Sequence, residues 1–230
     1  MSAEPLEQLD GELWVASRPL PLWVGDVGTR MTVIRLAGGD LILHSPVSLD
    51  PALREALDRI GRVRWVVGPS KVHHLFLGDT VRAYPSAELC GAPGLAEKRR
   101  DLHFQRVLDG EPVAAWGDQV LHHLFAGAPY LNEVVFLHRR TRTLLLTDLA
   151  FNVKPGPRNR ARIFHWLVGA TGRFGPHRIL RAAIRDREAA RGSLATILAW
   201  DFDRVIVAHG DVLEQDGREA LRAGFAFLRP

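Results

Sequence analysis

The chain has 230 residues, of which 47% are hydrophobic and 24% are charged, and its formal net charge is +4. This composition is typical of a globular protein, whereas a disordered chain would have fewer apolar residues and a larger net charge. The length fits a single domain, residues 1–230. No apolar run approaches the roughly 18 residues that a membrane span needs. The acidic and polar start, residues 1–10, lacks the features of a signal peptide.

The chain has one cysteine, Cys90, so an internal disulfide cannot form. A single thiol fits a reducing compartment, and we therefore expect a cytoplasmic protein.

Short β-branched and apolar runs predict strands, and apolar residues at helical spacing predict helices. The predicted strands, in chain order, span 14–16, 31–35, 41–44, 63–67, 87–89, 120–125, 133–138, 143–147 and 204–208. The predicted helices span 51–60, 93–100, 159–168, 177–190, 194–200 and 218–228.

The helix over 51–60 has both of its ends marked in the sequence. Asp50 is a suitable N-cap, and Pro51 suits the first helical position. Gly61 then ends the helix. The overall order of strands and helices favours sheets that are covered by helices over a simple parallel sheet.

Polar residues follow three of the predicted strands. His73 and His74 come after 63–67, Asp148 after 143–147, and His209 after 204–208. Loops at strand ends are where a rigid sheet presents functional groups, and imidazole and carboxylate are natural ligands for zinc. The alternative is that these are packed or hydrogen-bonded residues, because ten histidines place some at strand ends by chance.

The segments 63–74, 144–148 and 205–210 resemble the metallo-β-lactamase superfamily. That family has a strand followed by His-x-His-x-Asp-His, a later strand that ends in a bridging Asp, and a strand followed by His near the end of the chain. The segments 70–77, 92–95 and 133–136 resemble an uncharacterised branch of the superfamily. The resemblance implies a four-layer αββα sandwich of two mixed sheets, with the site at one sheet edge.

The metal-binding motif of this chain is degenerate. Aligning His74 with the last histidine of the motif puts His73 at its aspartate, Lys71 at its second histidine and Pro69 at its first. A later family histidine falls near Ala128. The resemblance therefore implies that the first metal site has lost its histidines.

The second metal site keeps His74, Asp148 and His209, with His73 in place of an aspartate. One metal there is expected to be zinc, or iron or manganese, in preference to magnesium. Four protein ligands around zinc would, however, give a closed structural site.

Two further residues are catalytic candidates. Lys71 could place its ammonium group at the vacant first site, beside Asp148, or could turn to solvent. Glu133 could act as a general base, although a surface role is the expected one.

The remaining histidines have no ligand pattern. His122 and His123 are adjacent on a predicted strand, so their side chains face opposite ways, and we interpret both as structural. His44, at a strand end, could support the site. His165 and His177 show no partner pattern.

The segment 152–191 is a basic insert, with ten Lys or Arg residues and two acidic ones, against a net −4 elsewhere. Its mixture of cations and aromatic residues, including Arg158, Arg160 and Trp166, is typical of surfaces that bind nucleic acid or anionic lipid. A solvated helical face, or a region that pairs with the acidic body, is the alternative.

The sequence thus predicts a metal-dependent, hydrolase-like protein with at most one metal and a small-molecule substrate. The alternative function is a non-catalytic descendant of the fold that binds nucleic acid or another anionic partner.

Overall fold

The strands predicted over 31–35 and 41–44 are confirmed, and they form a hairpin at the centre of the first sheet. The computed structural model describes residues 4–156 and 159–228, so Arg158 of the basic insert lies outside the described residues. Strands β5 (Thr29–Arg35) and β6 (Asp40–His44) pair antiparallel, with Thr32 opposite His44. Gly39 takes a left-handed conformation in the turn between them.

The first sheet has seven strands in the order β1-β2-β5-β6-β7-β8-β9. Its first pairs are antiparallel, and β6 to β9 run parallel to one another, so the sheet is mixed. The strands not yet given span Glu7–Asp10 (β1), Leu13–Arg18 (β2), Arg62–Gly68 (β7), Glu88–Gly91 (β8) and Arg106–Val107 (β9).

The second sheet has four strands in the order β10-β11-β12-β13, and only its last pair is parallel. Its strands span Val120–Leu124 (β10), Val134–His138 (β11), Thr143–Leu145 (β12) and Arg204–Ile206 (β13). A separate two-stranded hairpin is formed by β3 (Pro21–Leu22) and β4 (Gly25–Asp26).

The buried side chains form three layers of hydrophobic core, one between the two sheets and one on the outer face of each sheet. On β11, Val134 and Phe136 pack against side chains of the first sheet, while Val135 and Leu137 belong to the core on the outer face. This follows from the period of two in a strand.

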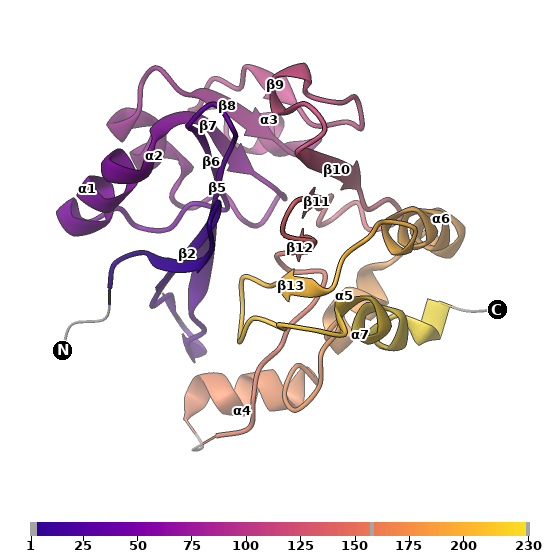
Figure 1. The fold of residues 1–230 in the computed structure, drawn as a ribbon. Helices are drawn as coiled ribbons and strands as arrows, with labels where there is room; N and C mark the ends of the chain where they lie inside the picture. Colours follow the sequence, from indigo (N-terminus) through magenta and orange to yellow (C-terminus); the bar gives the residue numbers. More distant parts are fainter. Residues whose placement is uncertain (1–3, 157–158, 229–230) are drawn as a thin grey trace.

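Helices cover the outer face of each sheet (Figure 1). The first sheet is covered by α1 (Pro51–Ile60), α2 (Leu77–Ala83) and α3 (Leu95–Lys98), and the second by α5 (Arg178–Ala183), α6 (Arg187–Leu198) and α7 (Gly217–Gly224). Helix α4 (Arg160–Leu167) lies at the lower edge of Figure 1, and short 3-10 turns span Ala114–Trp116 (η1) and Ala226–Leu228 (η2). The predicted αββα architecture is confirmed.

Helix α1 has the predicted ends. The Asp50 side chain accepts a hydrogen bond from the backbone N–H of Leu53 at 2.8 Å, and Gly61 is the C-cap.

Several elements differ from the sequence prediction: the short strands β1, β3, β4 and β9 were not predicted, and two helices also differ. Helix α2 was not predicted, because its N-cap, Phe76, offers no side-chain oxygen to accept a capping hydrogen bond. The closing helix predicted over 218–228 ends at Gly224 instead, where the chain turns into η2. Gly224 lies against Gly175, a tertiary contact that the sequence does not reveal.

In the described part of the basic insert, the helix predicted over 159–168 is α4. The helix predicted over 177–190 is interrupted, because α5 ends at its C-cap Ile184 and α6 begins after its N-cap Asp186, and α6 continues into the helix predicted over 194–200. A single domain with this segment as an insert stays a prediction. No helix among the described residues is long and apolar enough to cross a membrane.

Helix α4 is positioned by its contact with the β3–β4 hairpin. Gly25 has a φ of +108°, and a Cβ there would lie 2.9 Å from the backbone nitrogen of Ala161. The close approach therefore requires glycine at this position.

We expect Gly25→Ala to lower the free energy of unfolding by about 1–3 kcal/mol, because both backbone strain and a steric clash result. Urea denaturation measures the loss, and hydrogen exchange should show faster exchange in α4. Gly38→Ala is the matched control, since a Cβ there meets nothing within 4 Å. Equal stability of the two variants would contradict this role of Gly25.

Candidate metal centre

His73 lies in a loop that follows β7 and is held at both sides. The Ser70 hydroxyl accepts hydrogen bonds from the backbone N–H groups of Val72 and His73. The backbone N–H of Lys71 donates to the carbonyl of Leu131 at 2.9 Å, which ties the loop to the second sheet. The loop therefore presents His73 at the junction of the two sheets.

Asp148 lies in the turn after β12, and a buried carboxylate holds this turn. Glu133 is 1% exposed and accepts the backbone N–H groups of Thr147, Asp148 and Leu149 at 2.6, 2.7 and 3.0 Å. The expectation of a surface role for Glu133 is therefore wrong. Sequence reasoning missed its function because the three donors are backbone groups of another segment.

Burial and the negative charge of Asp148 raise the pKa of Glu133 to about 7. The hydrogen bonds from the backbone amides act in the opposite direction, because they stabilise the carboxylate, but they have the smaller effect. Glu133 does not contact the pocket but sets the conformation of the residues that carry Asp148.

His209 follows β13, and its position is set by the close packing of the next residue, Gly210, and by contacts of its own ring. Gly210 has a φ of +101°, and a Cβ there would lie 2.3 Å from the carbonyl oxygen of Asn152. The ring nitrogen Nδ1 of His209 contacts the carbonyl oxygen of Gly28 at 2.8 Å, so Nδ1 carries the proton and donates. The Phe151 ring stacks on the imidazole at 5.2 Å.

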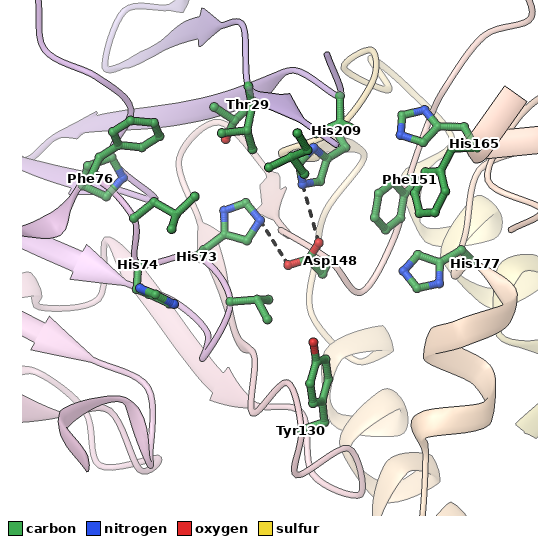
Figure 2. A pocket seen from close by; sticks show the side chains of 17 residues that line it. Thr29, His73, His74, Phe76, Tyr130, Asp148, Phe151, His165, His177 and His209 are labelled. Carbon is green, nitrogen blue, oxygen red and sulfur yellow. Dashed lines mark ion pairs between the residues drawn. The ribbon is translucent and has the colours of Figure 1, made fainter. Parts of the chain in front are cut away.

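The two histidines converge on the Asp148 carboxylate (Figure 2). His73 Nε2 is 3.1 Å from Oδ2, and His209 Nε2 is 3.5 Å from Oδ1. One ligand-type atom from each of the three residues lies within 4.8 Å of the others. Asp148 Oδ2 is buried, and its ion-pair partner is His73 Nε2.

The other ring nitrogen of His73 also has an oxygen partner. Nδ1 lies 2.8 Å from the hydroxyl of Ser45, a buried residue with a φ of 55°. Both histidines thus direct Nε2 toward Asp148 and have an oxygen behind Nδ1. This arrangement is characteristic of metal-ligating histidines, whose outer partner sets the tautomer and the ring orientation.

The electrostatics of the cluster keep Asp148 ionised. Burial alone would raise the pKa of Asp148, but the charge of His73 and the pairing with His209 outweigh it and hold this pKa far below its usual range. Burial likewise opposes a charge on His209, yet the contact with Asp148 prevails and raises the pKa of His209.

The cluster lies in a pocket of about 360 Å³, a size that suits a small molecule. The insert supplies part of the pocket wall through Phe164, His165 and His177. The Nδ1 atom of His177 accepts the backbone N–H of Leu180 at 3.0 Å, so Nε2 carries the proton when the ring is neutral. No sequence pattern gives a reason to select His165 or His177, because only folding brings them into the same pocket as Asp148.

Two predicted site residues lie apart from the cluster. The ring of His74 points away from Asp148 in Figure 2, and its Nδ1 lies 3.5 Å from the guanidinium of Arg99. The Lys71 ammonium donates to the carbonyl of Pro129 at 3.0 Å, and Lys71 is absent from the described residues that line the pocket. The structure therefore brings together His73, Asp148 and His209, but not His74 or Lys71.

His122 and His123 face opposite ways, as predicted. His122 packs against Trp116 and Phe136 between the sheets, while His123 contacts Trp200 on the outer side. Cys90 is buried, and burial raises its pKa to about 12, which keeps the thiol protonated.

The comparison with known families gives one match. The family described as a domain of unknown function (DUF4336) matches residues 10–165. No curated protein sequence matches the chain significantly.

Solved structures share the fold at low sequence identity. The metallo-β-lactamase from Pontibacter korlensis has a TM-score of 0.66 at 12% identity, with 97% of each chain covered. The metallo-β-lactamase from Hirschia baltica has a TM-score of 0.60 at 14% identity, with 98% of this chain and 99% of the other covered.

The metallo-β-lactamase FIM-1 from Pseudomonas aeruginosa, solved in a mono-zinc form, has a TM-score of 0.63 at 12% identity. That similarity covers 97% of this chain and 92% of the other. These likenesses confirm the metallo-β-lactamase fold that the sequence resemblance implied, and a shared fold does not by itself determine the function.

We expect Glu133→Gln to lower the free energy of unfolding by about 1–3 kcal/mol, because an amide cannot accept three backbone N–H groups as a carboxylate does. Chemical denaturation measures the loss. The exposed Glu55→Gln on α1 is the control and should change stability by less than about 0.5 kcal/mol. Equal losses would contradict the proposed support of the Asp148 turn.

A second prediction concerns His44, which is 2% exposed and packs edge-on against Phe136 at 4.8 Å. Burial, with a smaller effect from the charge of His73, lowers the pKa of His44 to about 3. Between about pH 6.5 and 3 the unfolded chain binds a proton that folded His44 does not. Stability should therefore fall as pH falls through this window, by up to about 1.4 kcal/mol per pH unit from this residue.

Chemical denaturation across the same pH window, in the wild type and in His44→Leu, tests this prediction. The variant should lose the part of the slope that one proton causes. His103→Leu, which replaces an exposed histidine, should keep the full slope. An unchanged slope in His44→Leu would show that His44 does not contribute.

Proposed function

The chain belongs to the DUF4336 family and has a metallo-β-lactamase fold, and from this premise we propose that it is a metal-dependent hydrolase with one metal ion. The ligands are His73, Asp148 and His209. The observation that carries the proposal is the convergence of two Nε2 atoms on one ionised carboxylate, with each Nδ1 backed by an oxygen.

The residues fit a transition metal better than magnesium. Two imidazoles and one carboxylate are a set typical of zinc, with iron or manganese as alternatives. The buried Asp148 Oδ2 pairs with His73 Nε2 at 3.1 Å, and a cation held by both residues would replace this contact. The mono-zinc form of FIM-1 supports the idea that this fold can hold a single zinc ion.

The number of ligands favours catalysis over a structural role. With His74 turned toward Arg99, the cluster offers three protein ligands, and catalytic zinc sites keep a fourth position for water or substrate. When bound, zinc would lower the pKa of a coordinated water and polarise the substrate.

The chain's own residues would then bind and orient the substrate. Ser45 and the Gly28 carbonyl hold the two imidazoles with Nε2 toward the pocket. The protonated Nε2 of His177, a residue that lines the pocket, can donate a hydrogen bond to an oxygen of a small substrate. The basic insert closes one side of the pocket and, with its net positive charge, would attract an anionic substrate.

We expect the purified chain to bind about one zinc ion and to be stabilised by it, by about 2.7 kcal/mol at a hundred times Kd. Asp148→Asn, His73→Ala and His209→Ala should abolish stoichiometric binding. Ser45→Ala should weaken it by about 10–100-fold, as loss of an outer hydrogen bond does. Trace-metal mass spectrometry and titration calorimetry measure these effects.

His74→Ala and Lys71→Ala are the matched controls, because both residues come from the same loop but lie outside the cluster. Both variants should bind zinc as the wild type does. Loss of zinc in His74→Ala equal to that in His73→Ala would contradict the three-ligand site. Metal-free protein that also ignores added zinc, iron and manganese would reject the metal centre altogether.

Hydrolysis is a separate question from metal binding. Esters, phosphodiesters and lactones, assayed with the metal-loaded chain, test it, with Asp148→Asn as the inactive control. A chain that binds zinc but hydrolyses none of these substrates would support the alternative of a non-catalytic binding protein with this fold.

A further inference from the structure

Eight of the nine exposed large hydrophobic side chains among the described residues lie at the pocket or on the segments that border it. Trp23 is 82% exposed and Trp166 is 69% exposed. Val107 on β9 is the exception among the described residues, because it lies on another part of the fold. Leu75 also lines the pocket, and Leu167 is the last residue of α4. We call the other six residues the apolar rim: Leu22, Trp23, Tyr130, Ile163, Trp166 and Ile179.

The rim residues come from separate segments that border the pocket. Leu22 and Tyr130 line the metal-site pocket, and Ile179 lines an adjoining hollow together with Tyr130 and Asp148. Trp23 lies edge-on to Phe164 of α4 at 6.3 Å. Trp166, on the same helix, lines a hollow of about 340 Å³ beside it. Exposed apolar side chains that are concentrated on one side of the fold in this way indicate an interaction site.

Cations border the rim without acidic partners. Arg160, Arg173 and Arg178 are exposed, and their guanidinium groups donate to backbone carbonyls, Arg160 to that of Trp23 at 2.9 Å. In the described part of 152–191, the one ion pair with a carboxylate is Lys154 with Asp211. The positive charge of this segment is therefore largely uncompensated and exposed beside apolar side chains.

We propose that the apolar rim and its arginines dock the protein on a lipid surface that contains anionic headgroups. Tryptophan and tyrosine are favoured at the boundary between headgroups and acyl chains, and isoleucine and leucine side chains gain by entering it. Arginines at the edge of the rim would contact lipid phosphates. A nucleic acid would use the same charges, but it offers little to the aliphatic side chains of Leu22, Ile163 and Ile179.

This docking has a consequence for the pocket. Its mouth would face the lipid surface, so an amphiphilic molecule could reach Asp148 from the interface without crossing bulk water. The docking itself goes beyond the proposed hydrolase function and does not depend on a bound metal.

Co-sedimentation of the full chain with vesicles tests the proposal. Vesicles of phosphatidylcholine alone are compared with an equal mixture of phosphatidylcholine and phosphatidylglycerol. We expect binding to the mixture, weak or no binding to phosphatidylcholine alone, and a decrease as salt screens the charges. Bromine-labelled lipid should quench the fluorescence of Trp23 and Trp166, and this quenching should disappear in the double variant Trp23→Ala/Trp166→Ala.

Matched variants separate the rim from general effects. Trp23→Ala/Trp166→Ala and Arg173→Glu/Arg178→Glu should each weaken binding to the mixture by roughly tenfold or more. Val107→Ala and Arg59→Glu change an exposed apolar residue and an exposed arginine elsewhere, and both should bind as the wild type does. Unchanged thermal unfolding of the variants verifies that they are folded.

Three results would overturn the proposal. The first is no binding to the mixed vesicles, and the second is equal binding by all variants. The third is evidence that the rim binds another partner. Such evidence would be a dimer in sedimentation that the Trp23→Ala/Trp166→Ala variant does not form, or binding of duplex nucleic acid by a chain that does not bind vesicles. Zinc binding by the same preparations reports on the metal centre independently, so failure of one proposal is distinguishable from failure of the other.

Discussion

The carboxylate of Glu133 accepts the backbone N–H groups of residues 147–149, and this buried contact connects the start of β11 to the turn that carries Asp148. Backbone donors buried without acceptors are costly, so the turn and the glutamate depend on each other. Through this turn, one interaction in the core sets where the carboxylate lies relative to both histidines. The site is thereby built on the rigid interior of the second sheet.

The two histidines reach Asp148 from opposite sheets, and each is oriented by an oxygen outside the cluster. Ser45, behind His73, follows β6 of the first sheet, while His209 follows β13 of the second and is backed by the carbonyl of Gly28. Because each imidazole is held through Nδ1, both Nε2 atoms are available toward the pocket. A cluster of this kind arises where the edges of the two sheets meet.

The basic insert and the preceding Phe151 form one wall of the pocket at this sheet edge. Phe151 stacks on His209 and contacts His177, and α4 brings Phe164 and His165 over the opening. The same helix presents Ile163 and Trp166 to the outside. Helix α4 thus contributes both to the wall of the pocket and to the outer surface beside it. A partner that binds this outer surface would therefore lie close to the entrance of the site.

The sequence by itself determined the elements with strong local signals: the two strands within 31–44, helix α1 with its Asp50 cap, and the strands before His73, Asp148 and His209. It also indicated the fold, because the order of these segments matches the superfamily. Only the tertiary structure decided that His74 turns to Arg99, that Lys71 binds the Pro129 carbonyl, and that Glu133 is buried. Side chains of adjacent loop residues can point in different directions, as those of His73 and His74 do. The backbone donors that hold Glu133 come from residues 147–149, after another strand. Local patterns report periodicity and capping, whereas side-chain direction depends on partners that folding brings from distant segments.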